Sequence, residues 1–162
     1  MDSPLGQLTL TAHGEFLTGI FYEAHWHLPP PEYFGAAVDI TDPVFSRAES
    51  ELTEYLDGGR TSFDIPFEAK GNAFQERVWE RLQHIPFGET VTYGQLAVEL
   101  GDPHLAQAVG SAVGRNPVSI IVPCHRVVGH KGQLTGYAGG LANKRFLLEL
   151  EEPAQVREGK LF

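Results

Sequence analysis

Apolar residues in the first 22 positions of the chain fall into two short runs, residues 5–10 and residues 16–22. The triplet His13-Gly14-Glu15 separates the runs and is typical of a tight turn. The pattern therefore predicts two strands joined by a turn. Residues 28–33 contain three successive prolines, which favours an exposed loop over a helix or a strand.

A helical period of apolar residues follows the prolines. Residues 42–57 begin with Asp42-Pro43, a cap followed by a first-turn proline, and carry an apolar face up to the stop signal Gly58-Gly59. Residues 63–65 predict a short strand, and residues 66–71 indicate a linker.

Helical spacing then recurs three times. Asn72 caps a first helix that extends to Ile85, and Thr92 caps a second that ends at Leu100. Asp102-Pro103 begins a third helix, which ends before Gly114. The tight turn between the last two predicts a helix-turn-helix unit, although many helical hairpins without a DNA role have the same outline.

The rest of the chain predicts short strands and one more helix. Residues 120–122 form a buried strand candidate, residues 126–128 and 134–137 a small hairpin, and residues 141–151 a last helix. A helix-turn-helix followed by a hairpin is the outline of a winged domain. The chain is therefore expected to be an α+β protein of two small domains, a mixed α/β domain over residues 1–70 and a winged helix-turn-helix domain over residues 71–162.

Charge is distributed unevenly over these two parts. The net charge of -9 arises from residues 1–71, which hold 3 Lys and Arg against 12 Asp and Glu. Residues 103–148 hold five Lys and Arg and no acidic residue, which is typical of a surface that faces phosphates. A chance fluctuation on a solvated face explains the same charges equally well.

The single cysteine, Cys124, lies in the sequence Pro-Cys-His-Arg. One cysteine excludes an internal disulfide and a multi-cysteine zinc site, and it fits a reducing, cytoplasmic compartment. No run of apolar residues is long enough for a membrane span, and the first residues do not form a signal peptide. An ordinary thiol is mostly protonated at neutral pH, so a nucleophilic Cys124 needs help from a neighbour such as His125. An inert buried cysteine is the alternative.

Several motifs, taken together, resemble the O6-alkylguanine-DNA alkyltransferases. They are Asn116-Pro117, Ile121 to Val128, Gly136 to Gly140 and Lys144, together with earlier matches in Phe74-Gln75, Val78-Trp79, Ile85 to Thr90, Tyr93 to Ala97 and Ala108 to Gly110. The resemblance covers residues 72–151 almost continuously, and residues 1–22 more weakly. It implies a ribonuclease H-like first domain. It also implies a reaction in which an alkylated guanine is flipped out of double-stranded DNA and its alkyl group is moved irreversibly onto the cysteine.

The resemblance assigns roles to residues around the thiol. Cys124 is the nucleophile and alkyl acceptor, His125 its base acting through a water, and Glu151 the group that orients His125. Tyr93 donates a proton to the guanine, and Asn116 braces the loop that carries the cysteine. Val127, Tyr137 and Ala138 are expected to bind the base. Taken without the resemblance, Glu151 is an ordinary helix-end acid, Tyr93 a half-buried core tyrosine and Asn116 a turn residue.

The resemblance also implies a mode of DNA binding. The helix after Pro103 is expected to enter the minor groove and to depend on backbone contacts and an inserted side chain. Its predicted DNA-binding residues, with two nearby arginines, are Gln107, Ala108, Gly110, Ser111, Arg115 and Arg126. Gln107 stands where the family has an arginine that fills the gap left by the flipped base, so capture of that base is expected to be weaker. No cofactor, metal or membrane partner is expected, and the protein is expected to be a monomer.

Three rival functions remain open at this point. A non-enzymatic relative would bind alkylated DNA and flag it for another pathway, but such relatives lack the acceptor cysteine. A transcriptional regulator would need domains for which 162 residues leave no room. A thiol hydrolase unrelated to DNA would not need the acid-free stretch or the helix pair.

Overall fold

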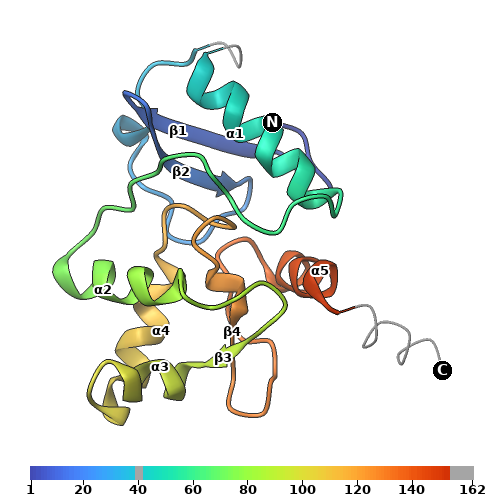
Figure 1. Ribbon diagram of the computed structural model, residues 1–162. Helices are drawn as coiled ribbons and strands as arrows, with labels where there is room; N and C mark the ends of the chain where they lie inside the picture. Colours follow the sequence, from blue (N-terminus) through green and yellow to red (C-terminus); the bar gives the residue numbers. More distant parts are fainter. Residues whose placement is uncertain (39–41, 154–162) are drawn as a thin grey trace.

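Two antiparallel strands form the sheet of the N-terminal half, β1 (Leu8–His13) and β2 (Phe16–Tyr22) (Figure 1). The computed structural model describes residues 1–38 and 42–153, and helix α1 (Pro43–Leu56) packs against this sheet. The Asp42 side chain accepts a hydrogen bond from the Val44 N–H, so the predicted cap is confirmed. The two strands and this helix were all predicted from periodicity.

Two other predictions for this half are wrong. The proline segment includes a short 3-10 helix, η1 (Pro31–Phe34), which the three prolines do not prevent because the first turn of a helix needs no donor from them. Residues 63–65 form no strand. The backbone N–H groups of Asp64 and Ile65 donate instead to one carboxylate oxygen of Glu51 on α1, at 2.8 and 3.2 Å, so they are not available to a ladder.

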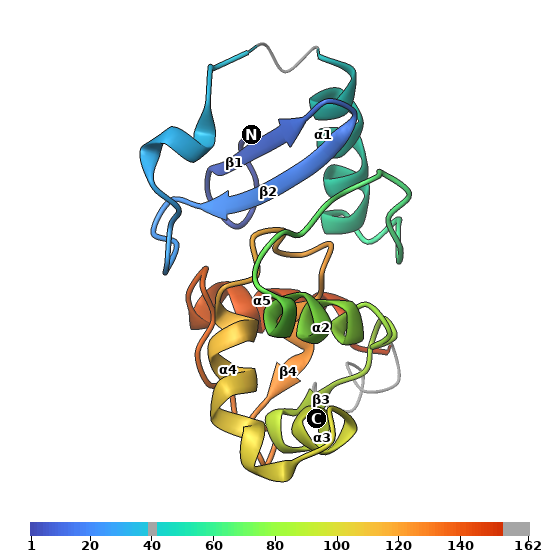
Figure 2. The same ribbon diagram turned by 90° about the vertical axis from the view of Figure 1, so that its left-hand side faces the viewer.

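Three helices build the first part of the C-terminal half: α2 (Ala73–Leu82), α3 (Tyr93–Glu99) and α4 (Ala106–Gly114). Asn72 with Gln75, and Thr92 with Gln95, form reciprocal capping boxes that fix where α2 and α3 begin. A short 3-10 turn, η2 (Pro103–Leu105), precedes α4, which therefore begins later than predicted. Helix α4 contacts both α2 and α3 (Figure 2).

The predicted hairpin of the wing is wrong. Strand β4 (Val127–Val128) pairs in parallel with β3 (Val91–Thr92), which precedes α3, and not with residues 134–137. The Gly129 N–H donates to the Gln133 carbonyl at 2.9 Å and closes a loop in place of a ladder. Because Val127 and Val128 are both buried, their pairing with a strand at the base of α3 ties the active-site segment to the helix pair.

The predicted strand at residues 120–122 is also wrong. The Val122 N–H donates to the Val118 carbonyl at 3.0 Å, so the chain folds back on itself. Ile120 has a φ of 76°, a left-handed conformation that an extended strand cannot contain and that a β-branched residue rarely adopts. This apolar run is buried because it forms a compact loop under the thiol.

The last helix, α5 (Leu141–Glu151), lies near the junction of the two halves, as Figure 1 shows. Strand β2 contacts the C-terminal half directly, since the Ile20 N–H donates to the Pro117 carbonyl at 2.9 Å. Gly139 lies against the ring of Tyr22, and a Cβ atom at that position would come within 2.5 Å of the ring. Only glycine fits there.

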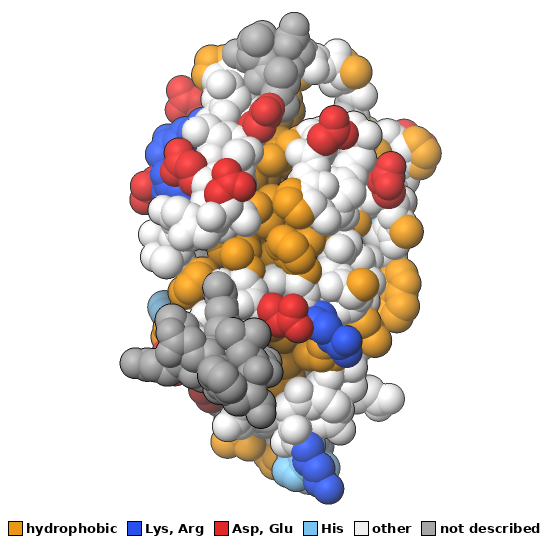
Figure 3. Space-filling model, turned by 90° about the vertical axis from the view of Figure 1, so that its right-hand side faces the viewer, with side chains coloured by type: hydrophobic (Ala, Val, Ile, Leu, Met, Phe, Trp, Pro, Cys, Tyr) orange, Lys and Arg blue, Asp and Glu red, His pale blue; other side chains and the backbone are white. Residues whose placement is uncertain are grey.

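The surface reflects the uneven charge of the sequence. Acidic side chains gather over the N-terminal half on the face in Figure 3, with hydrophobic side chains between the two halves. Within residues 1–38 and 42–153, none of the helices has the length and apolar character needed to cross a membrane. Residues 154–162 of the predicted second domain lie outside the described residues.

Candidate active site

Cys124 begins a single 3-10 turn, η3 (Cys124–Arg126), after the compact loop described above. Asn116 holds that loop with two hydrogen bonds. Its side-chain amide donates to the Val122 carbonyl at 2.9 Å, and its side-chain oxygen accepts from the Val118 N–H at 3.0 Å. The asparagine therefore lies where a brace for the cysteine loop needs to be.

The thiol of Cys124 is buried, and its pKa is raised above its ordinary value because burial disfavours the thiolate. A hydrogen bond with the Asn116 side chain and the charge of Lys144 act in the opposite direction but do not outweigh burial. The resting thiol is therefore protonated at neutral pH. It becomes a nucleophile only if a neighbouring group takes its proton.

His125 is the neighbour able to do this. Its Nε2 atom lies 2.8 Å from the Glu151 carboxylate, and both side chains are buried. A carboxylate only accepts hydrogen bonds, so Nε2 carries the hydrogen and Nδ1 keeps its lone pair. Burial lowers the pKa of His125, which keeps the imidazole neutral and able to accept a proton. Nδ1 is buried and has no hydrogen-bond partner within residues 1–38 and 42–153.

Glu151, at the end of α5, is buried and accepts hydrogen bonds from three residues, His125, Arg126 and Tyr55. Arg126 donates to both of its oxygens, at 2.8 and 3.0 Å, and the hydroxyl of Tyr55 on α1 donates to the oxygen that His125 also contacts. Burial alone would raise the pKa of Glu151, but the hydrogen bonds from His125 and Arg126 together bring it down to about 2. The acid is therefore charged and held from three directions.

Arg126 was predicted to bind DNA, and its position argues against that role. Its guanidinium is buried, bonded to Glu151 and to the Ile85 carbonyl at 2.6 Å, and it lies over the ring of Phe87. A side chain committed in this way cannot also reach phosphates. We therefore assign Arg126 to the support of Glu151.

A cavity of about 120 Å³ opens in front of the thiol. Its lining includes Cys124 itself and five further residues to which the sequence analysis gave a role: Tyr93, Gly110, Ser111, Tyr137 and Ala138. Burial raises the pKa of Tyr93, so its hydroxyl keeps its proton, and it points near the Thr135 carbonyl at 3.5 Å. Val127 is buried in β4 behind the thiol and is not part of this lining.

The remaining predicted DNA contacts follow one side of α4. Gln107, Ala108 and Ser111 are exposed, and Gly110 is partly exposed. Arg115, just after the helix, is exposed as well. These residues lie together on the accessible side of α4, next to the cavity that Gly110 and Ser111 line.

Sequence reasoning missed residues at the site that come from the N-terminal half. Tyr55 bonds Glu151, and Tyr22 shares a 2.6 Å hydrogen bond with Tyr137. Lys144, which the resemblance named without a role, is buried and donates to the Thr135 carbonyl at 2.8 Å, and burial lowers its pKa to about 8. No local signal in the sequence links Tyr55 or Tyr22 to the cysteine, because more than 60 residues separate them from it.

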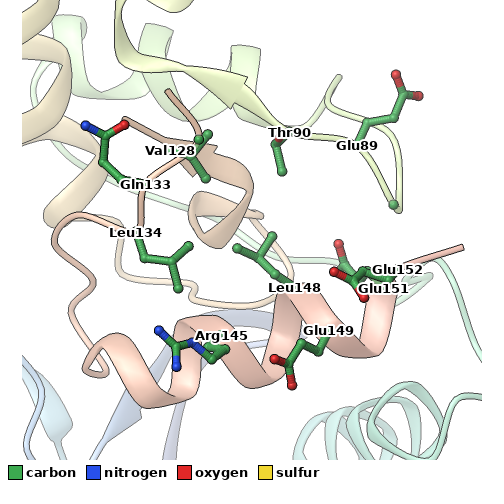
Figure 4. A pocket seen from close by; sticks show the side chains of 12 residues that line it. Glu89, Thr90, Val128, Gln133, Leu134, Arg145, Leu148, Glu149, Glu151 and Glu152 are labelled. Atoms are coloured by element: carbon green, nitrogen blue, oxygen red, sulfur yellow. The ribbon is translucent and has the colours of Figure 1, made fainter. Parts of the chain in front are cut away.

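A larger hollow of about 450 Å³ lies between α5, residues 88–90 and the loop after β4 (Figure 4). Val128, Leu134 and Leu148 point toward it. Glu151 reaches this hollow, but neither Cys124 nor His125 lines it. The smaller cavity is therefore the one that brings a ligand to the thiol. Within residues 1–38 and 42–153, no three His, Cys, Asp or Glu side chains are grouped so that they could hold a metal ion.

The fold and the site define a two-domain protein whose second domain presents a buried cysteine beside a histidine and glutamate pair. Two family models match it. The model described as "6-O-methylguanine DNA methyltransferase, ribonuclease-like domain" matches residues 1–69, and that described as "6-O-methylguanine DNA methyltransferase, DNA binding domain" matches residues 73–153. The chain belongs to the 6-O-methylguanine DNA methyltransferase family, as the resemblance predicted.

Individual relatives agree over nearly the whole chain. A methylated-DNA–protein-cysteine methyltransferase of Mycobacterium bovis is 45% identical over 170 residues, which covers 100% of this chain and 96% of the relative. One from Methanosarcina barkeri is 51% identical and covers 94% of each chain. A crystal structure of Mycobacterium tuberculosis OGT in complex with DNA has a TM-score of 0.80 at 43% identity and covers 96% of this chain and 94% of that one. The predicted two-domain α+β fold is confirmed.

Proposed function

We propose that this protein repairs DNA by direct reversal, taking the alkyl group from O6-alkylguanine in double-stranded DNA onto its own Cys124. In the transfer, a bond forms between the Cys124 sulfur and the alkyl carbon, and the bond between that carbon and guanine O6 breaks. Overall the thiol loses one proton and the guanine gains one, so a thioether and an unmodified guanine result. Each molecule acts once because the carbon–sulfur bond of the thioether is stable and no step of the reaction breaks it again.

The proposal rests on the buried hydrogen bond of 2.8 Å between Glu151 and His125, the residue that directly follows Cys124 in the chain. His125 accepts the thiol proton at Nδ1 through a water, while the charged Glu151 stabilises the imidazolium that forms. Arg126 and Tyr55 hold the carboxylate for this task.

The cavity residues receive the flipped base. Tyr93 donates a proton to the guanine, so that the guanine does not leave as an anion, and the proton that His125 took from the thiol restores the Tyr93 hydroxyl. Tyr137 and the backbone of Ala138 cover the base, and the Val127 carbonyl accepts from its amino group. Asn116 keeps the cysteine loop in the shape that this requires.

Helix α4 binds the DNA from the minor groove, with Gln107, Ala108, Gly110 and Ser111 at the contact and Arg115 beside the phosphates. The relative whose crystal structure contains DNA supports this partner. We propose that the protein acts as a monomer, without a cofactor, and in the cytoplasm, where its free thiol would persist.

Intact-mass measurement after incubation with a duplex that carries one O6-methylguanine tests the proposal. The expected result is a gain of one methyl group, mapped to the peptide that contains Cys124 and absent in Cys124→Ala. Tight binding to the lesion with no gain in mass would contradict transfer and would favour a protein that only flags damage.

A further inference from the structure

The loop after β2 joins the N-terminal half to the cavity in front of the thiol. Trp26 and His27 from this loop line that cavity beside Gly136, Tyr137 and Ala138 (the loop runs down toward the C-terminal half in Figure 2). The backbone N–H of Trp26 donates to the Ala138 carbonyl at 2.8 Å, so the loop is held against the segment that we propose covers the base.

The loop is held in a defined shape. The Tyr22 N–H donates to the His25 ring at 3.2 Å, and His27 has a φ of 57°, a left-handed turn that is uncommon for a residue other than glycine. The ring of Trp26 lies next to Gly136, where a Cβ atom would be 4.0 Å from it. The loop backbone is therefore held in place, and the Trp26 side chain lines the cavity while much of it stays exposed.

The two tryptophans of the chain differ in a way that indicates a role for one of them. Trp79 is 2% exposed, and its indole N–H donates to the Ala112 carbonyl at 2.7 Å, as expected of a core residue. Trp26 is 57% exposed. A single exposed apolar ring is common on a protein surface, but this one also lines the cavity in front of the thiol, where a bound base would cover it.

We propose that Trp26 is a base-binding residue, and that its indole stacks on the alkylated guanine as the base enters the cavity. The inference rests on the proposed function and adds a residue of the N-terminal half to the base site. Stacking on an aromatic ring suits any base and so any alkyl substituent. The stack would also help to retain the flipped base. Gln107 has no charge and therefore makes no ion pair with the phosphates that could do so.

The size of the cavity indicates that Trp26 stacks on the bound base and does not close the cavity against it. Its volume of about 120 Å³ is smaller than the roughly 300 to 1,000 Å³ typical of pockets that enclose a ligand. A purine with its substituent therefore extends beyond the enclosed space to the rim, where the exposed face of Trp26 lies. A residue that closed the cavity would itself be buried.

The test measures methyl transfer to Cys124 by intact mass, with O6-methylguanine supplied as the free base over a range of concentrations. The free base needs no flipping, so its half-saturating concentration reports on the cavity alone. We expect that concentration to rise roughly fivefold or more in Trp26→Ala and to stay within about twofold in Trp26→Phe, which keeps a ring. Leu28→Ala, an exposed change in the same loop but outside the cavity lining, is the matched control.

A fluorescence measurement gives a direct readout of the stack. In Cys124→Ala, which cannot accept the methyl group, the free base should quench indole emission. Adding Trp26→Phe leaves Trp79 as the only tryptophan and should abolish the quenching.

The outcomes separate the two proposals. Wild-type half-saturation, or faster transfer, in Trp26→Ala overturns the inference while repair by transfer stands. If the wild-type protein gains no methyl group from duplex or base, the proposed function fails. The loss or persistence of quenching in the Trp26→Phe background then still decides whether Trp26 stacks on the base.

Discussion

The two halves of the molecule contribute to the thiol site in different ways. The C-terminal half supplies a continuous stretch, residues 116–126. It contains the Cys124 thiol, the His125 imidazole that takes its proton, and Asn116, which braces the cysteine loop. The N-terminal half supplies single side chains, Tyr22, Trp26 and Tyr55, from a strand, a loop and a helix. The C-terminal half therefore carries the groups that react. The N-terminal half supports them through residues that belong to no recognisable sequence motif.

Glu151→Gln removes the charged group on which the reacting half depends, and it should have the largest effect. We expect transfer to slow by about 100-fold or more, because His125 loses the carboxylate that stabilises its protonated form. Arg126 would also lose its buried partner, at a cost of roughly 3 kcal/mol in the free energy of unfolding. Single-turnover rates and urea unfolding measure the two losses. An unchanged rate in a folded variant would contradict the role of Glu151.

The same variant predicts a difference in the dependence of stability on pH. The pKa of Glu151 in the folded protein is about 2, below its ordinary value of 4.5. Its contribution to stability is therefore fully present above pH 4.5 and is lost as the pH falls toward 2. Thermal unfolding at several pH values should show a steeper acid loss in the wild-type protein than in Glu151→Gln. Parallel curves would mean that other groups dominate.

Gly139→Ala tests the contact between the halves. The added methyl group would come within 2.5 Å of the Tyr22 ring, so the two halves must separate slightly. We expect a loss of about 1 to 3 kcal/mol in the free energy of unfolding, the usual cost of overpacking. Gly114→Ala is the control, because a Cβ atom there meets nothing within 4 Å. Equal stability of the two variants would contradict the tight contact.

Tyr55→Phe removes one hydroxyl of the supporting half and leaves its ring in place. Glu151 would keep His125 and Arg126, so we expect transfer to slow only a few-fold and stability to fall by about 1 to 2 kcal/mol. The pH-rate profile is the decisive measurement, since a change in the charge balance around His125 would displace it. A profile identical to that of the wild type would restrict Tyr55 to packing.

Gln107→Arg changes an exposed residue of α4, on the side that we propose contacts DNA, and should have the smallest effect. We expect transfer from duplex substrate to become a few-fold faster, because a cation near the phosphates favours the flipped state. Transfer from the free base should not change. An unchanged rate on the duplex would mean that Gln107 already fills the gap sufficiently.

Sequence patterns predicted the helices and the long strands well because their signals are local. Asp42, Asn72 and Thr92 each cap the helix that follows them, as predicted. The short strands were not predictable, because their partners were decided by distant contacts. The backbone N–H groups of Asp64 and Ile65 donate to the Glu51 carboxylate, and Val127 pairs with Val91, 36 residues earlier in the chain.

The site shows the same division. Cys124, His125 and Glu151 were predicted by resemblance and lie as neighbours. Arg126 was predicted to bind DNA, but its side chain is buried and donates to both oxygens of the Glu151 carboxylate, a pairing that its place in the sequence does not indicate. Tyr55 and Trp26 could not have been found, since nothing in their local sequence reports what lies across the domain junction.

The contact of Gly139 with Tyr22 constrains how the gene can change. A larger residue at position 139 is compatible with the fold only if the ring at position 22 becomes smaller at the same time. The hydroxyl of that ring also bonds Tyr137, two residues before Gly139. The two domains therefore cannot accumulate substitutions independently along this line. A chimera that joins the first domain of one relative to the second domain of another should fold well only when both positions come from the same parent.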